Sequence, residues 1–542
     1  MFEFTPIKTA RPTKYADFTV MRDWFCLYCD IETSLWYIWM STGDRIDDAN
    51  TERIIEWLKF IAYNKKKRTK KDSKIILYIN DIDKLQVFGE IQTREDFTDL
   101  LGDVKSKKLK EIILTDFIVR DAEPLTKESI KSLDEMIDIV SSYGLEPYRL
   151  KLTQASNAKL DFFRPISKEC WQDVVKNERY INKLRTYRDI TAGSAAGFLK
   201  VEPETTYKIL ENASSFDISS AYPSKYVNLD IFPIGKIYKC RERKFEKLSD
   251  LISSGQWFQI VFNDVKIQEF DILFKSKYFK SYGINCIEFA YAQRMPSIYK
   301  ALTDALNKFD WTLYFSDKQG YLLDSVRYRI VEFYEKKSIA STKSERTQYK
   351  MKIDMLYGKS IERDFFTEDK DVRNKYFRKG YNYLLPHWAR LVVASTKLQV
   401  FDAYVSDPYA FSADTDSVKS TNDLETLEHM FFERNQIILD KNKKAGFSGC
   451  KIGTWAHEYT ADRFVQFCPK QYIYDIHGEI HYKLAGFSKD DIETALSIGV
   501  DDPISYFIKN PEMYVTQGIE YDCNTDSFSK VKKLVRLGDM NE

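Results

Sequence analysis

Two acidic strings contain the residue types that could hold a divalent cation. The first is Asp217-Ile-Ser-Ser-Ala-Tyr222-Pro223, and the second is Ala413-Asp414-Thr415-Asp416-Ser417. Each follows an apolar or β-prone run, so we expect each to leave the end of a strand, the second at a hairpin tip. If these ends converge, three carboxylates meet, and crowded carboxylates repel one another unless a hard cation such as Mg²⁺ lies between them. The matching chemistry is phosphoryl transfer, in which two ions clamp the attacking and leaving oxygens.

Each string alone has an ordinary interpretation, because Asp-Thr-Asp-Ser is typical of a turn and four-residue matches are common accidents. A third element favours the chemical interpretation. The stretch 331–358 is compatible with a helix, and Lys350, Asp354 and Tyr357 follow i, i+4, i+7 spacing on one face. These side chains are unsuited to a hydrophobic core. They suit contact with the triphosphate, the sugar and the base of a nucleotide. Without the flanking strings, a solvated amphipathic surface would be the preferred interpretation.

In this order the strings resemble motifs A, B and C and the Lys-x-Tyr motif of family B DNA polymerases, and they are closer to the protein-primed branch found in bacteriophages and linear plasmids. Motif B corresponds to Lys350-x-x-x-Asp-x-x-Tyr-Gly-Lys, and Lys-x-Tyr to Lys470-Gln-Tyr472. Three further strings support the closer match: Thr191-Ala-Gly-Ser194, His387-Trp-Ala-Arg390 and Gly453-Thr-Trp-Ala-His-Glu458. The resemblance covers roughly residues 190–490, and four ordered motifs make coincidence improbable.

The resemblance implies a metal site and a nucleotide site. Asp217 and Asp416 would bind two Mg²⁺ ions, with Mn²⁺ as a substitute, and the backbone carbonyl of Ile218 would complete one shell while Asp414 lies nearby. Tyr222 would be a steric gate that leaves no room for a 2′-hydroxyl. The expected nucleotide-binding residues are Ser220, Tyr222, Lys350, Asp354, Tyr357 and Gly358.

Lys470 and Tyr472 would hold the primer end on this resemblance. The alternative for this string is an ordinary strand with a solvated lysine. Only its position after motif C favours primer binding.

Motif B departs from the family at Asp354, where the family usually has Asn. An anion would then face the nucleotide phosphates, and Lys350 is its weaker i, i+4 partner because the lysine comes first. We therefore expect either weakened nucleotide binding or a compensating cation among Lys336, Lys337 and Lys343.

The string Cys29-Asp30-Ile31-Glu32-Thr33 ends an apolar run and resembles the first motif of the family's 3′–5′ exonuclease domain. On an extended strand, Asp30 and Glu32 would share a face and ligate one ion. The other exonuclease motifs are incomplete. Leu85 stands where a metal-binding Asp belongs, with Asn80, Asp81 and Asp83 as candidate substitutes, and the third motif finds only Val174 and Glu178. We therefore expect editing to be weak or absent, with this domain kept as a wall for single-stranded template.

The net charge is +1, from 82 Lys and Arg against 81 Asp and Glu, so any DNA path must be a local basic stripe. A solvated loop is the preferred interpretation of the basic run 64–71, with template or partner contact as the second. A smaller basic cluster that could contact duplex DNA comprises Lys530, Lys532, Lys533 and Arg536.

The 8 cysteines form no zinc-ligand pattern, since Cys26-Leu-Tyr-Cys29 lacks a second pair, which favours reduced thiols in a cytoplasm. Neither a signal peptide nor a membrane-length apolar run is evident. We expect a soluble cytoplasmic protein of an infected bacterial host, with a monomer favoured.

The expected fold is α/β multidomain, with a ribonuclease-H-like exonuclease-type domain before a right-hand polymerase of palm, fingers and thumb with insertions. The expected segments are 1–190 exonuclease-like, 191–235 palm with motif A, 236–322 first insertion, 323–359 fingers, 360–383 second insertion, 384–485 palm with motif C, and 486–542 thumb. The resemblance implies that the first insertion binds a terminal-protein primer. The shortness of the second places strand displacement in doubt.

The expected activity is template-directed addition of deoxynucleotides to a primer–template, replicating a phage or linear-plasmid genome from a terminal-protein primer. The alternatives are a DNA-primed or primer-independent gap-filling polymerase, and a non-catalytic nucleic-acid-binding scaffold. A nuclease with a vestigial polymerase half fits less well, because the better-preserved motifs lie in the polymerase half.

Overall fold

The structure is a computed structural model that describes residues 4–5, 19–40, 44–68, 73–80, 84, 111–114, 117–122, 130–141, 190, 197–240, 244–263, 265–270, 274, 281–360, 386–487, 489–496, 502–522 and 527–538. The chain divides into two compact units. The first comprises Met1–Asn157, Phe487–Ile498 and Glu512–Arg536, and the second comprises Ala158–Gly486, Gly499–Pro511 and Leu537–Glu542. Within the described ranges, none of the helices is both long and apolar enough to span a membrane.

A seven-stranded mixed sheet with the order β1-β6-β7-β5-β2-β3-β4 forms the centre of the first unit. Neighbours β2, β5 and β7 run parallel, and the other pairs are antiparallel. The strands are Phe4–Thr5 (β1), Thr19–Cys29 (β2), Trp36–Met40 (β3), Arg45–Ala49 (β4), Ser73–Ile79 (β5), Glu111–Leu114 (β6) and Phe117–Asp121 (β7), and the helices are Thr51–Arg68 (α1) and Leu133–Ser141 (α3).

Strand β2 is buried on both faces, which explains why its sequence shows no polar alternation. Trp24 and Cys26 lie in a core cluster with Met136 of α3. On the opposite face, the ring of Phe25 lies 5.8 Å from that of Trp57 of α1. Successive strand side chains point to opposite faces, so a helix covers each one.

The first unit also contains a hairpin of Glu512–Asp522 (β21) and Ser527–Arg536 (β22), against which helix Lys489–Leu496 (α16) packs. The basic cluster expected near the C-terminus lies on β22. Lys532 and Lys533 are both exposed but adjacent, so they point to opposite faces of the hairpin. This cluster therefore has basic side chains on both faces of the hairpin.

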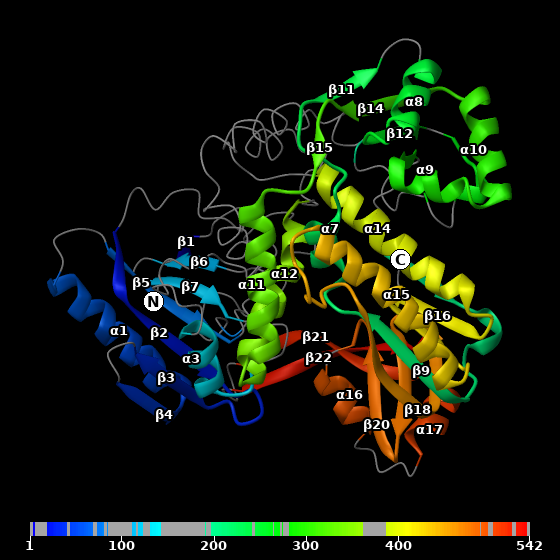
Figure 1. The fold of residues 1–542 in the computed structure, drawn as a ribbon. Coiled ribbons are helices and arrows are strands. Elements are labelled where there is room, and N and C mark those ends of the chain that lie inside the picture. Colours follow the sequence, from blue (N-terminus) through cyan, green and yellow to red (C-terminus); the bar gives the residue numbers. More distant parts are fainter. Residues whose placement is uncertain are drawn as a thin grey trace. The chain divides into compact units, whose positions relative to one another are not determined.

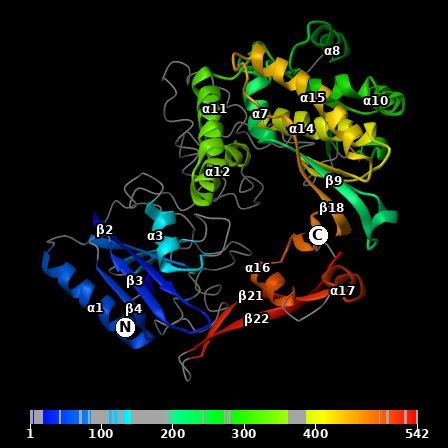
Figure 2. The same ribbon diagram turned by 60° about the horizontal axis from the view of Figure 1, so that its bottom comes forward.

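The second unit is centred on an antiparallel sheet with the order β20-β19-β18-β9-β17-β16-β8. The strands are Phe198–Val201 (β8), Leu210–Ile218 (β9), Ala410–Thr415 (β16), Ser417–Ser420 (β17), Trp455–Cys468 (β18), Gln471–Ile476 (β19) and Glu479–Leu484 (β20). Helices Ala221–Asn228 (α7), Pro386–Ser406 (α14) and Leu424–Lys444 (α15) cover one face (Figures 1 and 2). Phe431 of α15 stacks on Phe216 of β9, with ring centroids 4.2 Å apart.

Between residues 237 and 316 the chain forms a separate antiparallel sheet with the order β11-β14-β12-β13. Its strands are Ile237–Cys240 (β11), Phe258–Asn263 (β12), Ser281–Asn285 (β13) and Trp311–Ser316 (β14), and its helices are Lys244–Ser253 (α8), Cys286–Ala292 (α9) and Pro296–Lys308 (α10). The short strands Phe232–Pro233 (β10) and Gln319–Gly320 (β15) pair where the chain leaves and returns. This closure makes the segment an inserted lobe.

The helix-compatible stretch 331–358 is two helices rather than one, which corrects the expected continuous helix. Asp324–Ile339 (α11) ends before Ser341, and Lys343–Ser360 (α12) begins after Thr342. The Thr342 hydroxyl accepts a hydrogen bond from the Glu345 amide at 3.1 Å. The Glu345 carboxylate in turn accepts from the Ser341 amide at 3.3 Å. This reciprocal capping starts a new helix, and its Ser-Thr-x-x-Glu pattern is visible in the sequence.

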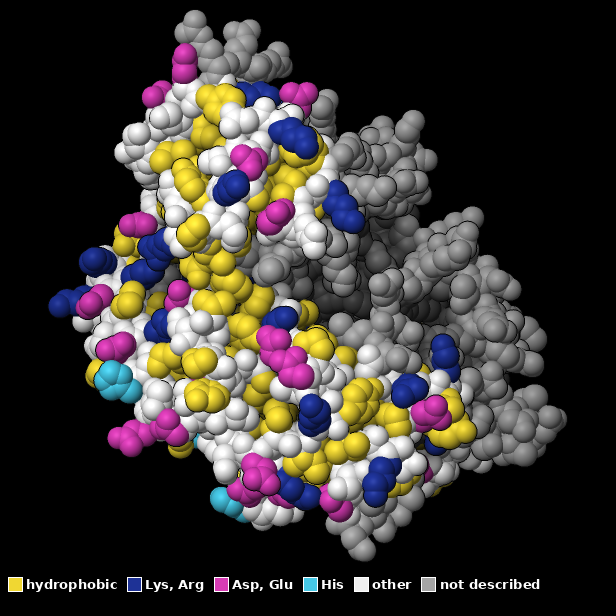
Figure 3. Space-filling view, turned by 90° about the vertical axis from the view of Figure 1, so that its right-hand side faces the viewer, with side chains coloured by type: hydrophobic (Ala, Val, Ile, Leu, Met, Phe, Trp, Pro, Cys, Tyr) yellow, Lys and Arg dark blue, Asp and Glu magenta, His cyan; other side chains and the backbone are white. Residues whose placement is uncertain are grey.

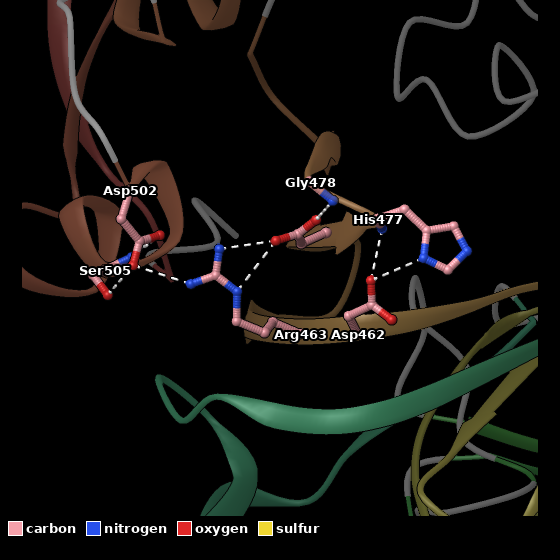
Figure 4. Close-up of polar contacts among 7 residues, drawn as sticks. Asp462, Arg463, His477, Gly478, Asp502 and Ser505 are labelled. Atoms are coloured by element: carbon pink, nitrogen blue, oxygen red, sulfur yellow. Dashed lines mark hydrogen bonds and ion pairs between the residues drawn. The ribbon is translucent and has the colours of Figure 1, made fainter.

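An arginine joins the end of the large sheet to helix Pro503–Lys509 (α17), as Figure 4 shows. Arg463 of β18 donates to Asp475 of β19 at 2.9 Å and to Asp502 at 3.0 Å. Asp502 is also the N-cap of α17, where its side chain accepts from Ser505. The hydrogen bond of Ser505, followed by the charge of Arg463, lowers the pKa of Asp502. The cap is therefore kept ionised, the form that accepts hydrogen bonds best.

Candidate active site

Asp217 and Asp416 come from adjacent strands of the large sheet. Asp217 is the penultimate residue of β9, and Asp416 is the turn residue between β16 and β17. Antiparallel pairing of β17 with β9 places Ser417 opposite Asp217. The Ile218 amide donates to the Asp416 carbonyl oxygen at 2.8 Å. The structure thus brings the two acidic strings together, as the strand-end argument predicted.

The turn that carries Asp416 is held in a restricted backbone conformation. Thr415 has φ +64°, a left-handed value that few non-glycine residues adopt. Gly197 lies so close that a Cβ built on it would be 2.8 Å from the Thr415 Cα. A side chain at position 197 would displace this turn, so the glycine is required by close backbone approach.

Both carboxylates are held where ionisation is costly. Burial raises the pKa of Asp217, and the charges of Asp416 and Glu458 raise it further, while Lys350 and Lys483 act in the opposite direction. Burial likewise raises the pKa of Asp416. Two partly buried carboxylates with raised pKa values would both be favoured in their ionised forms by a cation between them.

Asp414, the third carboxylate, is bound by lysines instead. Its side chain is 2% exposed and lies 2.8 Å from the Lys483 Nζ and 3.7 Å from the Lys470 Nζ. Burial alone would raise the pKa of Asp414, but Lys483, Lys419 and Lys470 together lower it below its usual range. Its negative charge is therefore already compensated within the protein.

Lys483 of β20 is a site residue that the sequence interpretation missed. It lies directly opposite Tyr472 in the β19–β20 hairpin, and its Nζ is 5.8 Å from the centre of the Tyr472 ring. The hairpin turn consists of His477 and Gly478, both with positive φ. A His-Gly pair between two β-prone runs could have predicted this register, since a two-residue turn fixes which residues face each other.

The string from Gly453 anchors the first acidic string. The Gly453 amide donates to the Ser219 carbonyl oxygen at 2.7 Å, and the Ser219 amide donates to the Thr454 carbonyl oxygen at 2.9 Å. Gly453 has φ +87°, and a Cβ there would lie 2.7 Å from the Ser224 Cβ. Glycine is therefore needed both for conformation and for space.

The stripe predicted on the helix faces the carboxylates. The Tyr357 ring of α12 lies 4.7 Å from the Tyr222 ring of α7, at an angle of 32°. Lys350 lies near enough to Asp217 to lower its pKa, and Asp354 lies near enough to Asp416 to raise its pKa. A Cβ at Gly358 would meet nothing within 4 Å, so no close contact in this structure requires that glycine.

The cation expected near Asp354 is Lys337 of α11. Burial lowers the pKa of Lys337, and the charge of Asp354 opposes that shift. The Lys337 Nζ also donates to the Ser220 hydroxyl at 3.0 Å. Lys336 is instead paired with Glu332 at 2.8 Å, and the side chain of Lys343 lies outside the described residues.

Of the three carboxylates, Asp217 and Asp416 are the two that suit a divalent cation. Within the described ranges, no three His, Cys, Asp or Glu side chains are arranged to hold a metal ion. Asp414 lies close enough to Asp416 to raise its pKa, but the lysines already balance the charge of Asp414. Asp217 and Asp416 remain as partly buried oxygen donors beside Ile218. Such a pair suits Mg²⁺, which is commonly bound by one or two carboxylates plus substrate phosphates.

The lysine and tyrosine expected at the primer end lie beside the same site. Lys470 has φ +66° and directs its Nζ toward Asp414, so it is more than a solvated strand lysine. Tyr472 is 7% exposed, and its ring lies 4.7 Å from the Lys419 Nζ. Tyr472 therefore packs between lysines, where it helps to position Lys483.

Asp30 and Glu32 do not share the face of a strand, which corrects that expectation. Strand β2 ends at Cys29, and residues 31–33 form a turn. The Asp30 carboxylate accepts a hydrogen bond from the Glu32 amide at 2.9 Å, and the Asp30 amide donates to the Leu35 carbonyl oxygen at 3.0 Å. Aspartate commonly forms such turns with its own backbone, and here that preference ends the strand early.

Asn80 also has a structural role at this strand end. Its side chain accepts from the Cys29 amide and donates to the Cys29 carbonyl oxygen, both at 3.1 Å. The buried Lys84 ammonium donates to the same carbonyl. The other exonuclease candidates, Asp81, Asp83, Leu85, Val174 and Glu178, lie outside the described residues, as do 191–194 and 361–385.

The fold is similar to that of DNA polymerases, a likeness that rests on structure rather than sequence. No protein-family model matches the chain, and no curated protein matches it. Solved structures of one polymerase match over nearly its whole length. They include phi29 DNA polymerase complexed with primer-template DNA and incoming nucleotide substrates, with a TM-score of 0.55 and 12% identity, covering 95% of this chain and 100% of that chain.

Phi29 DNA polymerase complexed with primer-template DNA in a post-translocation binary complex is similar to the same degree. Its TM-score is 0.54 and its identity 12%, covering 96% of this chain and 100% of that chain. At this identity the likeness establishes the fold.

Proposed function

We propose that the chain is a template-directed DNA polymerase that adds deoxynucleotides to a primer 3′-hydroxyl. The observation that carries this proposal is the convergence of Asp217 and Asp416 on adjacent strands, faced by Lys350 and Tyr357 of one helix. The similarity to solved DNA polymerases supports it.

In this proposal, positioning and charge compensation do most of the chemical work, as is general for phosphoryl transfer. Asp217 and Asp416 would hold Mg²⁺, which supplies positive charge to the reacting oxygens. Lys350 would hold the triphosphate as a point charge, and Lys337 would reduce the repulsion between Asp354 and the phosphates. Lys483 and Lys470 would balance the negative charge of Asp414 beside the primer end.

Primer extension tests this proposal directly. We expect wild-type protein to extend a labelled primer–template with Mg²⁺ and deoxynucleotides, and not with ribonucleotides. The control is the same reaction with the divalent cation chelated. No extension over a range of metals and salt concentrations would contradict the proposal and favour a non-catalytic scaffold that binds nucleic acid.

Tyr222 is proposed as the gate that excludes ribonucleotides. Its ring is packed against that of Tyr357, which restricts where the Tyr222 ring can lie. Tyr222→Ala should reduce discrimination against ribonucleotides by roughly ten- to two-hundredfold, the range that removal of a steric contact produces. Tyr222→Phe retains the ring and should preserve discrimination. The measurement is the ratio of kcat/KM for a deoxynucleotide to that for its ribonucleotide. An equal ratio in wild type and Tyr222→Ala would contradict the role of Tyr222 as a gate.

Asp354→Asn should lower the KM for the incoming deoxynucleotide by about fivefold. Removing one negative charge about 4 Å from a phosphate in a well-hydrated site is worth about 1 kcal/mol. Steady-state incorporation over a range of nucleotide concentrations measures the effect, with Glu335→Gln, at an exposed position on α11, as the control. The benefit of Lys337 should also shrink in the Asp354→Asn background, which a double-mutant cycle would reveal. An unchanged or higher KM would contradict the interpretation.

We also propose a terminal-protein primer, with the inserted lobe as its binding region, and weak or absent 3′–5′ editing. The lobe's own sheet and its closure by β10 and β15 support the first proposal.

The order β4-β3-β2-β5-β7 within the first unit's sheet supports a ribonuclease-H-like domain. The turn at Asp30 and the structural role of Asn80 support loss of editing. Equal degradation of single-stranded DNA by wild type and by a double variant, Asp30→Ala with Glu32→Ala, would support that loss.

A further inference from the structure

A cleft of about 600 Å³ lies within the second unit and is separate from the candidate active site. Residues of α7, α8, α9, α14 and α15 line it, and none of the candidate catalytic or nucleotide-binding residues does. Its volume falls in the range typical of small-molecule sites. Figure 3 shows one face of the molecule on which hydrophobic side chains gather, with both basic and acidic side chains beside them.

A buried lysine lines the cleft. Lys225 of α7 is 4% exposed, and its ammonium donates to the Gln399 side chain. In the part of the chain that the structure describes, no carboxylate lies within ion-pair distance of it. Burial, and then the nearby charge of Lys441, lower the pKa of Lys225 to about 7. A buried ammonium with only an amide partner is costly, and an anion would remove that cost.

The remaining charges of the lining also favour an anion. The lining includes Arg294, Arg434 and Lys441 besides Lys225, and its one acidic residue is Asp402. The Asp402 carboxylate is already engaged, since it lies 3.0 Å from the Arg434 guanidinium and accepts from the Tyr291 hydroxyl at 3.4 Å. The cleft therefore has more positive than negative charge.

Much of the remaining wall is apolar and comes from four elements. Leu251 of α8, Phe258 of β12, Leu398 of α14 and Trp455 of β18 all line the cleft. Ile252, also in the lining, is 37% exposed. A ligand that satisfies this wall needs an apolar body of several rings or a long chain, because small ions leave that surface unused.

We propose that this cleft binds an amphipathic organic anion, with its apolar body against the wall and one carboxylate, sulfonate or phosphate group at the Lys225 ammonium. Such a ligand would contact α7 and β18, two elements that also adjoin the candidate active site. Lys225 follows Tyr222 on the short helix α7, and Trp455 pairs with Ile218 across the sheet. The binding claim does not rest on the proposed polymerase activity.

Isothermal titration calorimetry with 8-anilinonaphthalene-1-sulfonate tests the proposal, and the neutral N-phenyl-1-naphthylamine is the matched probe without the sulfonate. We expect one sulfonate per chain. Lys225→Met should weaken sulfonate binding at least about tenfold, the effect of losing a charge-assisted contact, and leave the neutral probe unchanged. The exposed Lys300→Met, outside the cleft, should leave both affinities unchanged.

A second variant keeps the test decisive if Lys225→Met does not fold. Ile252→Trp reduces the cleft volume from its exposed side and should weaken both probes. Sulfonate affinity that is equal in wild type and folded Lys225→Met would overturn the proposal. So would unchanged affinity of Ile252→Trp for both probes, or several equivalent sulfonate sites that respond to neither substitution.

Discussion

Asp217→Asn and Asp416→Asn should each reduce nucleotide incorporation by at least about a thousandfold. A metal ion at such a site supplies several kcal/mol of transition-state stabilisation, and each 1.36 kcal/mol is about tenfold in rate. Single-nucleotide incorporation on a primer–template measures the loss. Asp440→Asn, at an exposed position on α15, is the matched control and should retain full activity.

The same substitutions should have an opposite effect on stability. Burial raises the pKa values of Asp217 and Asp416, and neighbouring carboxylates raise them further, so the unfolded chain releases these protons at lower pH than the folded chain. Stability is therefore lost as pH rises through this window, and neutralising either residue should raise the Tm at neutral pH in chelator. Added Mg²⁺ should raise the Tm of wild type more than that of either variant. If a variant lost activity but its Tm in chelator did not rise, the loss would indicate a folding defect. That result would contradict Asp217 and Asp416 as the metal-binding pair.

Glu288→Ala should destabilise the second unit by about 3–5 kcal/mol, the cost of removing one partner from a buried ion pair. Glu288 has no exposed side-chain area and pairs with Arg390, which is equally buried, and with the Lys397 ammonium at 3.1 Å. Without it, two cations would remain in the core. Glu288 also completes the capping box at the start of α9, accepting from the Asn285 amide at 3.2 Å.

The unfolding midpoint in urea, followed by tryptophan fluorescence, measures this effect. Glu288→Gln retains the side-chain oxygen and should lose less stability than Glu288→Ala. Glu269→Ala is a suitable control because Glu269 is exposed in the same inserted lobe, and it should change stability by less than about 0.5 kcal/mol. A Glu288→Ala variant as stable as this control would show that the buried cluster contributes little.

Local patterns in the sequence predicted the positions of the candidate site residues along their elements. The β-prone run before Asp217, and the turn chemistry of Asp-Thr-Asp-Ser, correctly predicted a strand end and a hairpin tip. The 3.6-residue period correctly placed Lys350, Asp354 and Tyr357 on one helical face. These features depend on residues close together in the chain, which is why they can be read without the fold.

Only the tertiary structure decided which charges meet. Sequence order could not tell that Lys483 compensates Asp414, because their contact depends on the register of strands far apart in the chain. From the sequence, Lys336, Lys337 and Lys343 were equal candidates for the cation near Asp354. The packing of α11 against α12 brings Lys337 near it. The turn at Asp30 depended on a competition between strand extension and a local hydrogen bond. The sequence therefore determined which groups each element carries, and packing between distant elements determined which groups neutralise one another.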